Sequence, residues 1–105
     1  MQAAHIDRHS DFAAEKMAKN NVFESECMFC DVYCFEPGQS QRVHTHAGSD
    51  KVYYVIEGSP TFEVDGERQA LGPGHAVWAP AGSEHGVSNE STERARLLVF
   101  MAPRP

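Results

Sequence analysis

From residue 22 onward, the chain is a series of short β-rich runs separated by turn residues. Asp65-Gly66 stands between two alternating runs and predicts a two-residue β-hairpin. Many short strands at regular spacing are typical of an all-β sandwich or barrel. The predicted strands cover residues 28–35, 41–46, 51–57, 60–65, 75–79, 85–88 and 95–101.

Three histidines stand at the ends of these predicted strands. His44 and His46 belong to one strand, and because strand side chains alternate with a period of two, both point to the same face. His85 begins another strand and can close a three-nitrogen site. Imidazole is the commonest protein ligand for divalent transition metals. The pattern therefore predicts one metal site formed by His44, His46 and His85.

The spacing of glycines and histidines resembles the two motifs of the cupin family. The first motif is matched by Gly38, His44, His46 and Gly58. The second motif is matched by Gly74, Pro80, Gly82, His85 and Asn89. The resemblance covers roughly residues 35–102 and implies a double-stranded β-helix, a jelly-roll barrel of two sheets. It also implies that the three histidines bind one divalent ion, which the sequence leaves open among Fe, Mn, Ni, Zn and Cu.

The chain departs from the family pattern at the fourth ligand, a glutamate that normally precedes a Tyr-Tyr-Val run. Counting back from Gly58 places Lys51 at this position, whereas counting from His46 places Asp50 there. A protonated lysine has no lone pair for a metal. Asp50 can supply the carboxylate through a bulge, the metal can keep three histidines and water, or Lys51 can replace the charge of the metal. We favour the three-histidine site with open positions.

The strand over residues 51–57 also supplies the candidate catalytic side chains. Lys51 and Tyr53 share one face of this strand, and the resemblance places that face inside the barrel. We expect Lys51 or Tyr53 to donate a proton or to hold a substrate carboxylate. A salt bridge from Lys51 to Asp50 or Glu57 at the barrel mouth is the competing interpretation.

The N-terminal region lacks the strand pattern. Ser10 is typical of the cap of a short helix over residues 11–19. We therefore divide the chain into an arm with a short helix, residues 1–23, and a cupin barrel domain, residues 24–105. The arm lacks the apolar core of a signal peptide, and three cysteines without a secretion signal argue against a disulfide framework. We expect a cytoplasmic protein.

Charge and hydropathy narrow the range of partners. The net charge of −6 argues against nucleic acid, and no apolar run approaches membrane-spanning length. The final strand, residues 95–101, is apolar on both faces beyond Arg96. We expect a homodimer built partly from the N-terminal segment around Phe12 to Phe23 and partly from an exposed sheet.

Two classes of function fit these features. The resemblance implies a metal-dependent isomerase, lyase or dioxygenase that acts on a small polar or anionic metabolite. The alternative is a non-catalytic small-molecule-binding or sensing module that uses the same pocket. The fold does not decide between them, because many functions share this barrel.

Overall fold

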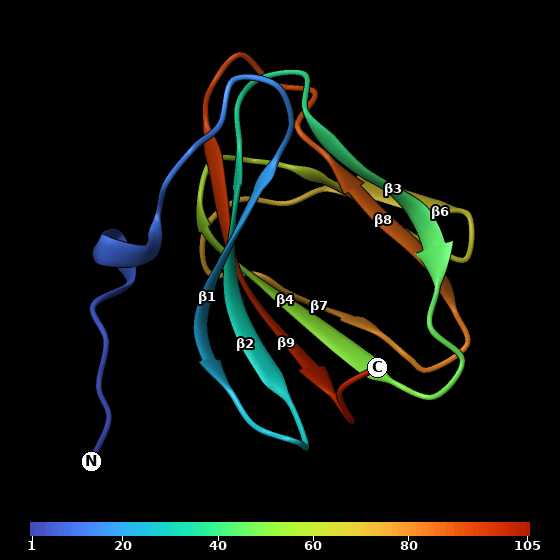
Figure 1. The fold of residues 1–105 in the computed structure, drawn as a ribbon. Helices are drawn as coiled ribbons and strands as arrows, with labels where there is room; N and C mark the ends of the chain where they lie inside the picture. Colours follow the sequence, from blue (N-terminus) through green and yellow to red (C-terminus); the bar gives the residue numbers. More distant parts are fainter.

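Two antiparallel sheets enclose the core of the protein (Figure 1). The computed structural model describes all residues, 1–105. The five-stranded sheet has the order β1 (Ala18–Glu24), β2 (Phe29–Phe35), β9 (Ala95–Ala102), β4 (Asp50–Glu57) and β7 (Ala76–Ala79). The four-stranded sheet has the order β3 (Ser40–Thr45), β8 (Glu84–Ser88), β5 (Thr61–Val64) and β6 (Glu67–Ala70). This double-stranded β-helix confirms the predicted all-β jelly-roll barrel.

Alternating burial along the strands places the core between the two sheets. In β4, Lys51, Tyr53 and Val55 are buried, whereas Asp50 and Tyr54 are exposed. Fully burying a large apolar side chain is worth about 1.5–3 kcal/mol, so this alternation stabilises one register of the strand. The same alternation in the neighbouring and facing strands supplies other members of the core, including Ala95, Leu97, Val99, Phe62 and Val87.

The predicted hairpin at Asp65-Gly66 is confirmed and joins β5 to β6. Both residues have positive φ, 48° for Asp65 and 84° for Gly66, as a type I′ turn requires. The pairing of Val64 with Glu67 leaves only these two residues in the loop. The sequence did not predict β6, because its four residues are all exposed and carry no apolar alternation.

A β-bulge in β3 determines which of its side chains face the barrel interior. Gln41 pairs with Val87 and His44 pairs with His85, so β3 has one residue more than β8 across this interval. The extra residue reverses the alternation, and both Gln41 and His44 consequently share the inward face of their buried partners. Gly86 lies opposite the bulge, where an added Cβ would stand 2.8 Å from the backbone nitrogen of Val43.

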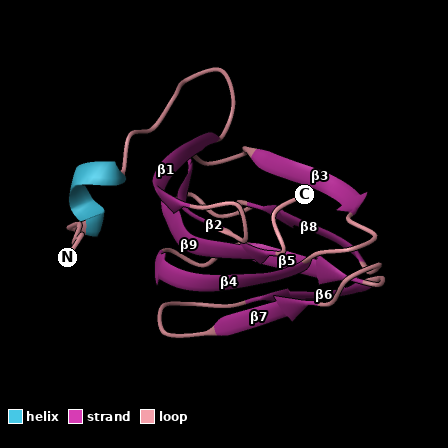
Figure 2. Cartoon of the chain, turned by 60° about the horizontal axis from the view of Figure 1, so that its bottom comes forward, coloured by secondary structure: helices cyan, strands magenta, loops and turns pink.

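The N-terminal segment differs most from its prediction. The helix expected over residues 11–19 is wrong; the short helical segment is instead a 3-10 helix, η1 (Ile6–His9), which lies beside the barrel (Figure 2). Residues from Ala18 onward, including part of the expected arm, form β1. Hydrogen bonds with β2 outweigh the weak helical preference of this segment. No helix in the structure has the length and apolar character needed to cross a membrane.

Candidate metal centre

The three histidines predicted as ligands lie together at one end of the barrel. His44 on β3 pairs directly with His85 on β8, and His46 follows two residues after His44. The ring centroids of His44 and His85 are 4.5 Å apart, and His46 lies 4.8 Å from His44 and 5.5 Å from His85. One nitrogen from each ring lies within 4.8 Å of the other two. We call this group the histidine site.

Backbone carbonyls orient two of the rings. Nδ1 of His44 lies 2.7 Å from the oxygen of Arg42, and Nδ1 of His85 lies 3.1 Å from the oxygen of Ser83. A carbonyl oxygen can only accept, so each Nδ1 carries the proton and each Nε2 keeps its lone pair. Nε2 of His85 is buried and has no hydrogen-bond partner. Buried polar atoms are rarely left unpaired, and this nitrogen fits the role of a metal ligand.

The turn after β7 positions the third histidine. The backbone nitrogen of Gly82 donates to the oxygen of His46 at 2.8 Å. Gly82 has a φ of 84°, which glycine adopts without strain. This bond joins Gly82 of the second motif to His46 of the first motif. The two motifs therefore meet at the histidine site, which explains why their spacing was sufficient to predict the three histidines.

The electrostatic surroundings keep all three rings neutral. Burial lowers the pKa of His85 to about 4; the hydrogen bond to the backbone oxygen of Ser83 opposes this shift, and the positive charge of Lys51 adds to it. Burial also lowers the pKa of His44 and of His46, and the positive charges of Lys51 and Lys19 contribute at both. Only a neutral imidazole has a lone pair for a metal. Near neutral pH, the donor set therefore fits one divalent transition ion.

Lys51 occupies the interior of the barrel next to this site. Its side chain is 1% exposed, and Nζ donates to Oε1 of Gln41 at 3.2 Å. Nζ also lies 5.2 Å from the ring centre of Tyr33 and 5.1 Å from that of Tyr53. Burial lowers its pKa to about 8, helped by Lys19 and opposed by Asp31. The salt bridge to Asp50 or Glu57 that the sequence left open is not formed.

Asp50, the other residue considered for the fourth ligand position, is not brought to the histidines. Its side chain is exposed, and Oδ1 accepts a hydrogen bond from the backbone nitrogen of Ala81 at 2.9 Å. Regular pairing at the start of β4 turns Lys51 inward, so its neighbour Asp50 points outward. The register counted back from Gly58 describes this strand, and the register counted from His46 does not.

Tyr53 lies beneath the histidine site, on the same face of β4 as Lys51. Its ring centre is 6.5 Å from that of His85 and 5.3 Å from that of Phe62. The hydroxyl is buried without a hydrogen-bond partner, and burial raises the pKa of the phenol. Tyr53 therefore retains its proton, which is available to a ligand that enters the barrel.

Sequence reasoning missed the two residues that hold Lys51. Gln41 accepts its hydrogen bond, and the ring of Tyr33 covers its ammonium group. Gln41 and His44 are three residues apart, which places them on opposite faces of a regular strand. Only the bulge in β3 brings them to one face, and no glycine or proline within β3 signals it.

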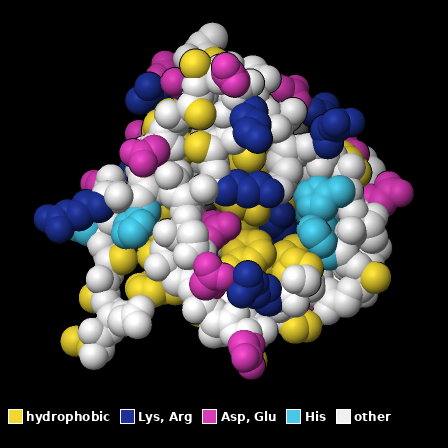
Figure 3. All heavy atoms as spheres, in the orientation of Figure 1, with side chains coloured by type: hydrophobic (Ala, Val, Ile, Leu, Met, Phe, Trp, Pro, Cys, Tyr) yellow, Lys and Arg dark blue, Asp and Glu magenta, His cyan; other side chains and the backbone are white.

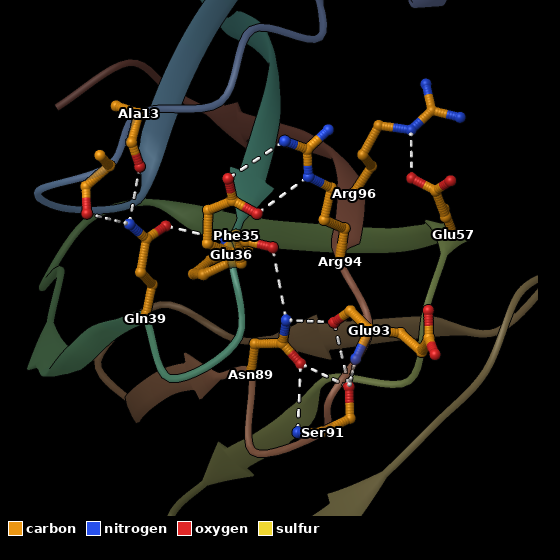
Figure 4. A network of polar contacts seen from close by, with 11 residues as sticks. Ala13, Phe35, Glu36, Gln39, Glu57, Asn89, Ser91, Glu93, Arg94 and Arg96 are labelled. Carbon is orange, nitrogen blue, oxygen red and sulfur yellow. Dashed lines mark hydrogen bonds and ion pairs between the residues drawn. The ribbon is translucent and has the colours of Figure 1, made fainter.

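Asn89, the last residue of the second motif, stabilises a loop at the opposite end of β8 (Figure 4). Its Nδ2 donates to the oxygen of Phe35 at 3.3 Å and to that of Glu93 at 2.7 Å. Its Oδ1 accepts from the hydroxyl of Ser91 at 2.8 Å. Asn89 thus belongs to the scaffold and lies away from the histidine site.

Comparison with known proteins places these features in a family. Residues 31–101 match the family described as the cupin domain. A 72-residue segment, 66% of this chain and 48% of the relative, is 38% identical to the tetracenomycin polyketide synthase protein TcmJ of Streptomyces glaucescens. A 65-residue segment, 62% of this chain and 54% of the relative, is 25% identical to an oxalate-binding protein of Thermotoga maritima. The matched segments span about half the length of these relatives.

A solved structure matches the whole chain. The crystal structure of TT1209 from Thermus thermophilus has 51% sequence identity and a TM-score of 0.97, with 100% of both chains covered. The similarity therefore includes the N-terminal segment and β1 as well as the barrel.

Proposed function

The chain belongs to the cupin domain family, and on this premise we propose that it is a metal-dependent enzyme that acts on a small polar metabolite. One observation carries the proposal: three histidine side chains converge at one end of the barrel, and the buried Nε2 of His85 has no partner within the protein. Structural polar groups in a barrel are normally paired, whereas ligand-binding groups stay available.

The residues around the histidine site have distinct roles in this proposal. His44, His46 and His85 hold one divalent ion of Fe, Mn, Ni, Zn or Cu, which when bound supplies Lewis acidity. Lys51 binds an anionic group of the substrate, because its ammonium is bonded only to the neutral amide of Gln41. Tyr53 is the proton or hydrogen-bond donor of the site, because its buried hydroxyl faces the barrel and has no partner in the protein.

This arrangement suits isomerase, lyase or dioxygenase chemistry, in which a small oxygen-rich molecule is bound and a proton is moved. The competing proposal is a non-catalytic binding or sensing module, which the likeness to an oxalate-binding protein favours. Tyr53→Phe separates the two: an enzyme of the proposed kind loses turnover with little change in ligand affinity. A binding module has no turnover to lose.

Elemental analysis of protein purified without a histidine tag tests the metal. We expect close to one divalent transition ion per chain. Chelation should lower the melting temperature, because a ligand that binds only the folded state stabilises it. His46→Ala should abolish that shift, whereas Ala47→Ser, next to it and exposed, should preserve it. Metal-free protein that ignores added Fe, Mn, Ni, Zn and Cu contradicts the proposal.

We also propose a cytoplasmic homodimer that covers the outer face of the five-stranded sheet. Trp78 is 62% exposed there, Tyr54 42% and Phe100 41%, and the register places Trp78, Val52 and Phe100 in one row. This row carries no charge, so an equally uncharged surface covers it best, and a second copy provides one. The three free cysteines suit a reducing compartment. Light scattering should give the mass of two chains, and Trp78→Arg should give one; a wild-type mass of one chain refutes the dimer.

A further inference from the structure

The basic residues of this acidic protein differ in whether they form ion pairs. The chain has nine Lys and Arg residues against fifteen Asp and Glu residues, so carboxylate partners are abundant. Arg68, Arg94, Arg96 and Arg104 each form an ion pair. The other five cations form none within 4.0 Å, and four of these five gather around Gln41: Lys16, Lys19, Arg42 and Lys51.

Three of these cations line one cavity. It has a volume of about 810 Å³ and lies between β1 and β3, the edge strands of the two sheets. Lys16 and Lys19 line it from the N-terminal side, and Gln41 and Arg42 line it from β3. No Asp or Glu is among its lining residues. We call it the cationic cavity.

Two side chains connect the cationic cavity to the interior of the barrel. Gln41 lines the cavity, and its Oε1 accepts the hydrogen bond from the buried Nζ of Lys51. Nζ of Lys19 lies 5.5 Å from the ring centre of Tyr33, the same ring that faces Lys51 at 5.2 Å. Gln41 and Arg42 lie on β3 together with His44, so the cavity and the histidine site share one strand, and the bulge turns Gln41 and His44 to the same face.

The surface of the molecule is hollowed between the two sheets (Figure 3). Figure 3 shows a hollow between the two sheets, with an apolar floor, histidine side chains along one wall, and basic and acidic side chains along the other. The nearby carboxylate is Asp31, which is partly buried and accepts a hydrogen bond from Nδ2 of Asn21 at 2.8 Å. Asp31 forms no ion pair within 4.0 Å with Lys19 or Lys51, so both ammonium groups remain available to a ligand.

We propose that the cationic cavity binds a carboxylate or phosphate group of the same small molecule that reaches the histidine site. This inference rests on the proposed function and adds the substrate class: an elongated molecule with an anionic group remote from the reacting end. Lys16, Lys19 and Arg42 hold the remote anion, and Lys51 lies between the two ends. Unpaired cations in a cavity without carboxylates repel each other, and an anion relieves that repulsion.

Calorimetric titration of the metal-loaded protein at low ionic strength tests this inference. The probes are inorganic phosphate, acetate and the dicarboxylates succinate and adipate. We expect a dicarboxylate to bind more tightly than acetate, and more tightly with metal than without it. Arg42→Gln and Lys16→Gln should each weaken dicarboxylate binding about tenfold, the loss of one charged hydrogen bond. Arg8→Gln is the matched control, because Arg8 is unpaired but lies on η1, outside the cavity.

The outcomes separate this inference from the proposed function. If Arg42→Gln and Arg8→Gln bind dicarboxylates equally well, with metal bound in both, the cationic cavity does not hold the anionic group and the metal proposal is unaffected. Protein that never retains metal, but loses anion binding in Arg42→Gln, overturns the metal proposal and supports the cavity as an anion site. Binding of phosphate alone, with no gain for dicarboxylates when metal is present, refutes the link between the two places.

Discussion

The two ends of β8 differ in how their polar groups are used. Around Asn89, both atoms of the side-chain amide are bonded, and Arg94 pairs with Glu36 at 2.8 Å (Figure 4). Around His85, the hydroxyl of Tyr53 and Nε2 of His85 have no partner, and Lys51 is bonded to a single neutral amide. A region whose hydrogen bonds are complete stabilises the fold, whereas a region with free groups retains the capacity to bind.

The largest effect should come from the bonded end. Asn89→Ala removes the donor to the buried oxygen of Phe35 and to that of Glu93. Leaving the buried carbonyl of Phe35 unpaired costs about 1–3 kcal/mol, and losing the bonds to Glu93 and Ser91 adds to this, so we expect the free energy of unfolding to fall by about 3 kcal/mol. Urea denaturation measures this loss.

Ser88→Ala is the control for that substitution, because its hydroxyl bonds only to the exposed carboxylate of Glu90. Its effect should stay below about 0.5 kcal/mol. If Asn89→Ala is equally mild, the loop is not held by the amide and the contrast between the two ends fails.

A smaller effect, on metal affinity, should come from the histidine end. Lys51→Glu removes a positive charge beside the three rings and supplies the oxygen donor that the family carries at this position. We expect the protein to bind a divalent ion about tenfold more tightly, which corresponds to about 1.4 kcal/mol. Competition with a chelator of known affinity measures the change.

Asp50→Ala is the companion variant, and it should leave metal affinity unchanged because Asp50 bonds to Ala81 instead. If Asp50→Ala strips the metal while Lys51→Glu has no effect, the carboxylate of Asp50 is a ligand in solution and the assignment of Lys51 is wrong.

The smallest effect concerns stability and pH at Lys51. Its pKa is lowered to about 8 in the folded protein, from an ordinary value of 10.5. Between these values the unfolded chain binds more protons, so the free energy of unfolding rises with pH across this window and the gain is absent below it. Metal-free wild type should gain about 1 kcal/mol relative to Lys51→Met from pH 7 to about pH 8.7. Urea denaturation of both proteins at each pH tests this. If their free energies of unfolding change with pH in the same way, the pKa of Lys51 is not lowered in the folded protein.

Much of the fold and of the site was predictable because it depends on local patterns. The alternation in residues 51–57 predicted that Lys51 and Tyr53 share one face, the resemblance implied that this face points inward, and both side chains are buried. The His-x-His pair and the motif containing His85 predicted three converging rings, which the structure contains. These features follow from strand periodicity and turn glycines, which are visible in a single sequence.

The missed features depend on partners that are distant in sequence. β1 forms because β2 offers it a paired edge, and nothing within residues 18–24 records that partner. β6 follows from the Asp65-Gly66 turn and pairing with β5, although its residues are exposed and polar. The hydrogen bond between Lys51 and Gln41 requires two strands from different sheets to face each other, so neither strand predicts it alone.

The bulge in β3 also determines which mutations this protein can tolerate. Deleting one residue between Gln41 and His44 would restore regular alternation, and either Gln41 or the two histidines would then turn to solvent. A side chain at Gly86 would meet the backbone of Val43 and force the same choice. Gly86 contributes no side chain to the histidine site, yet its replacement would break the ligand geometry. The geometry of the histidine site therefore depends on a residue that supplies no ligand atom, because only a missing side chain leaves room for the bulge.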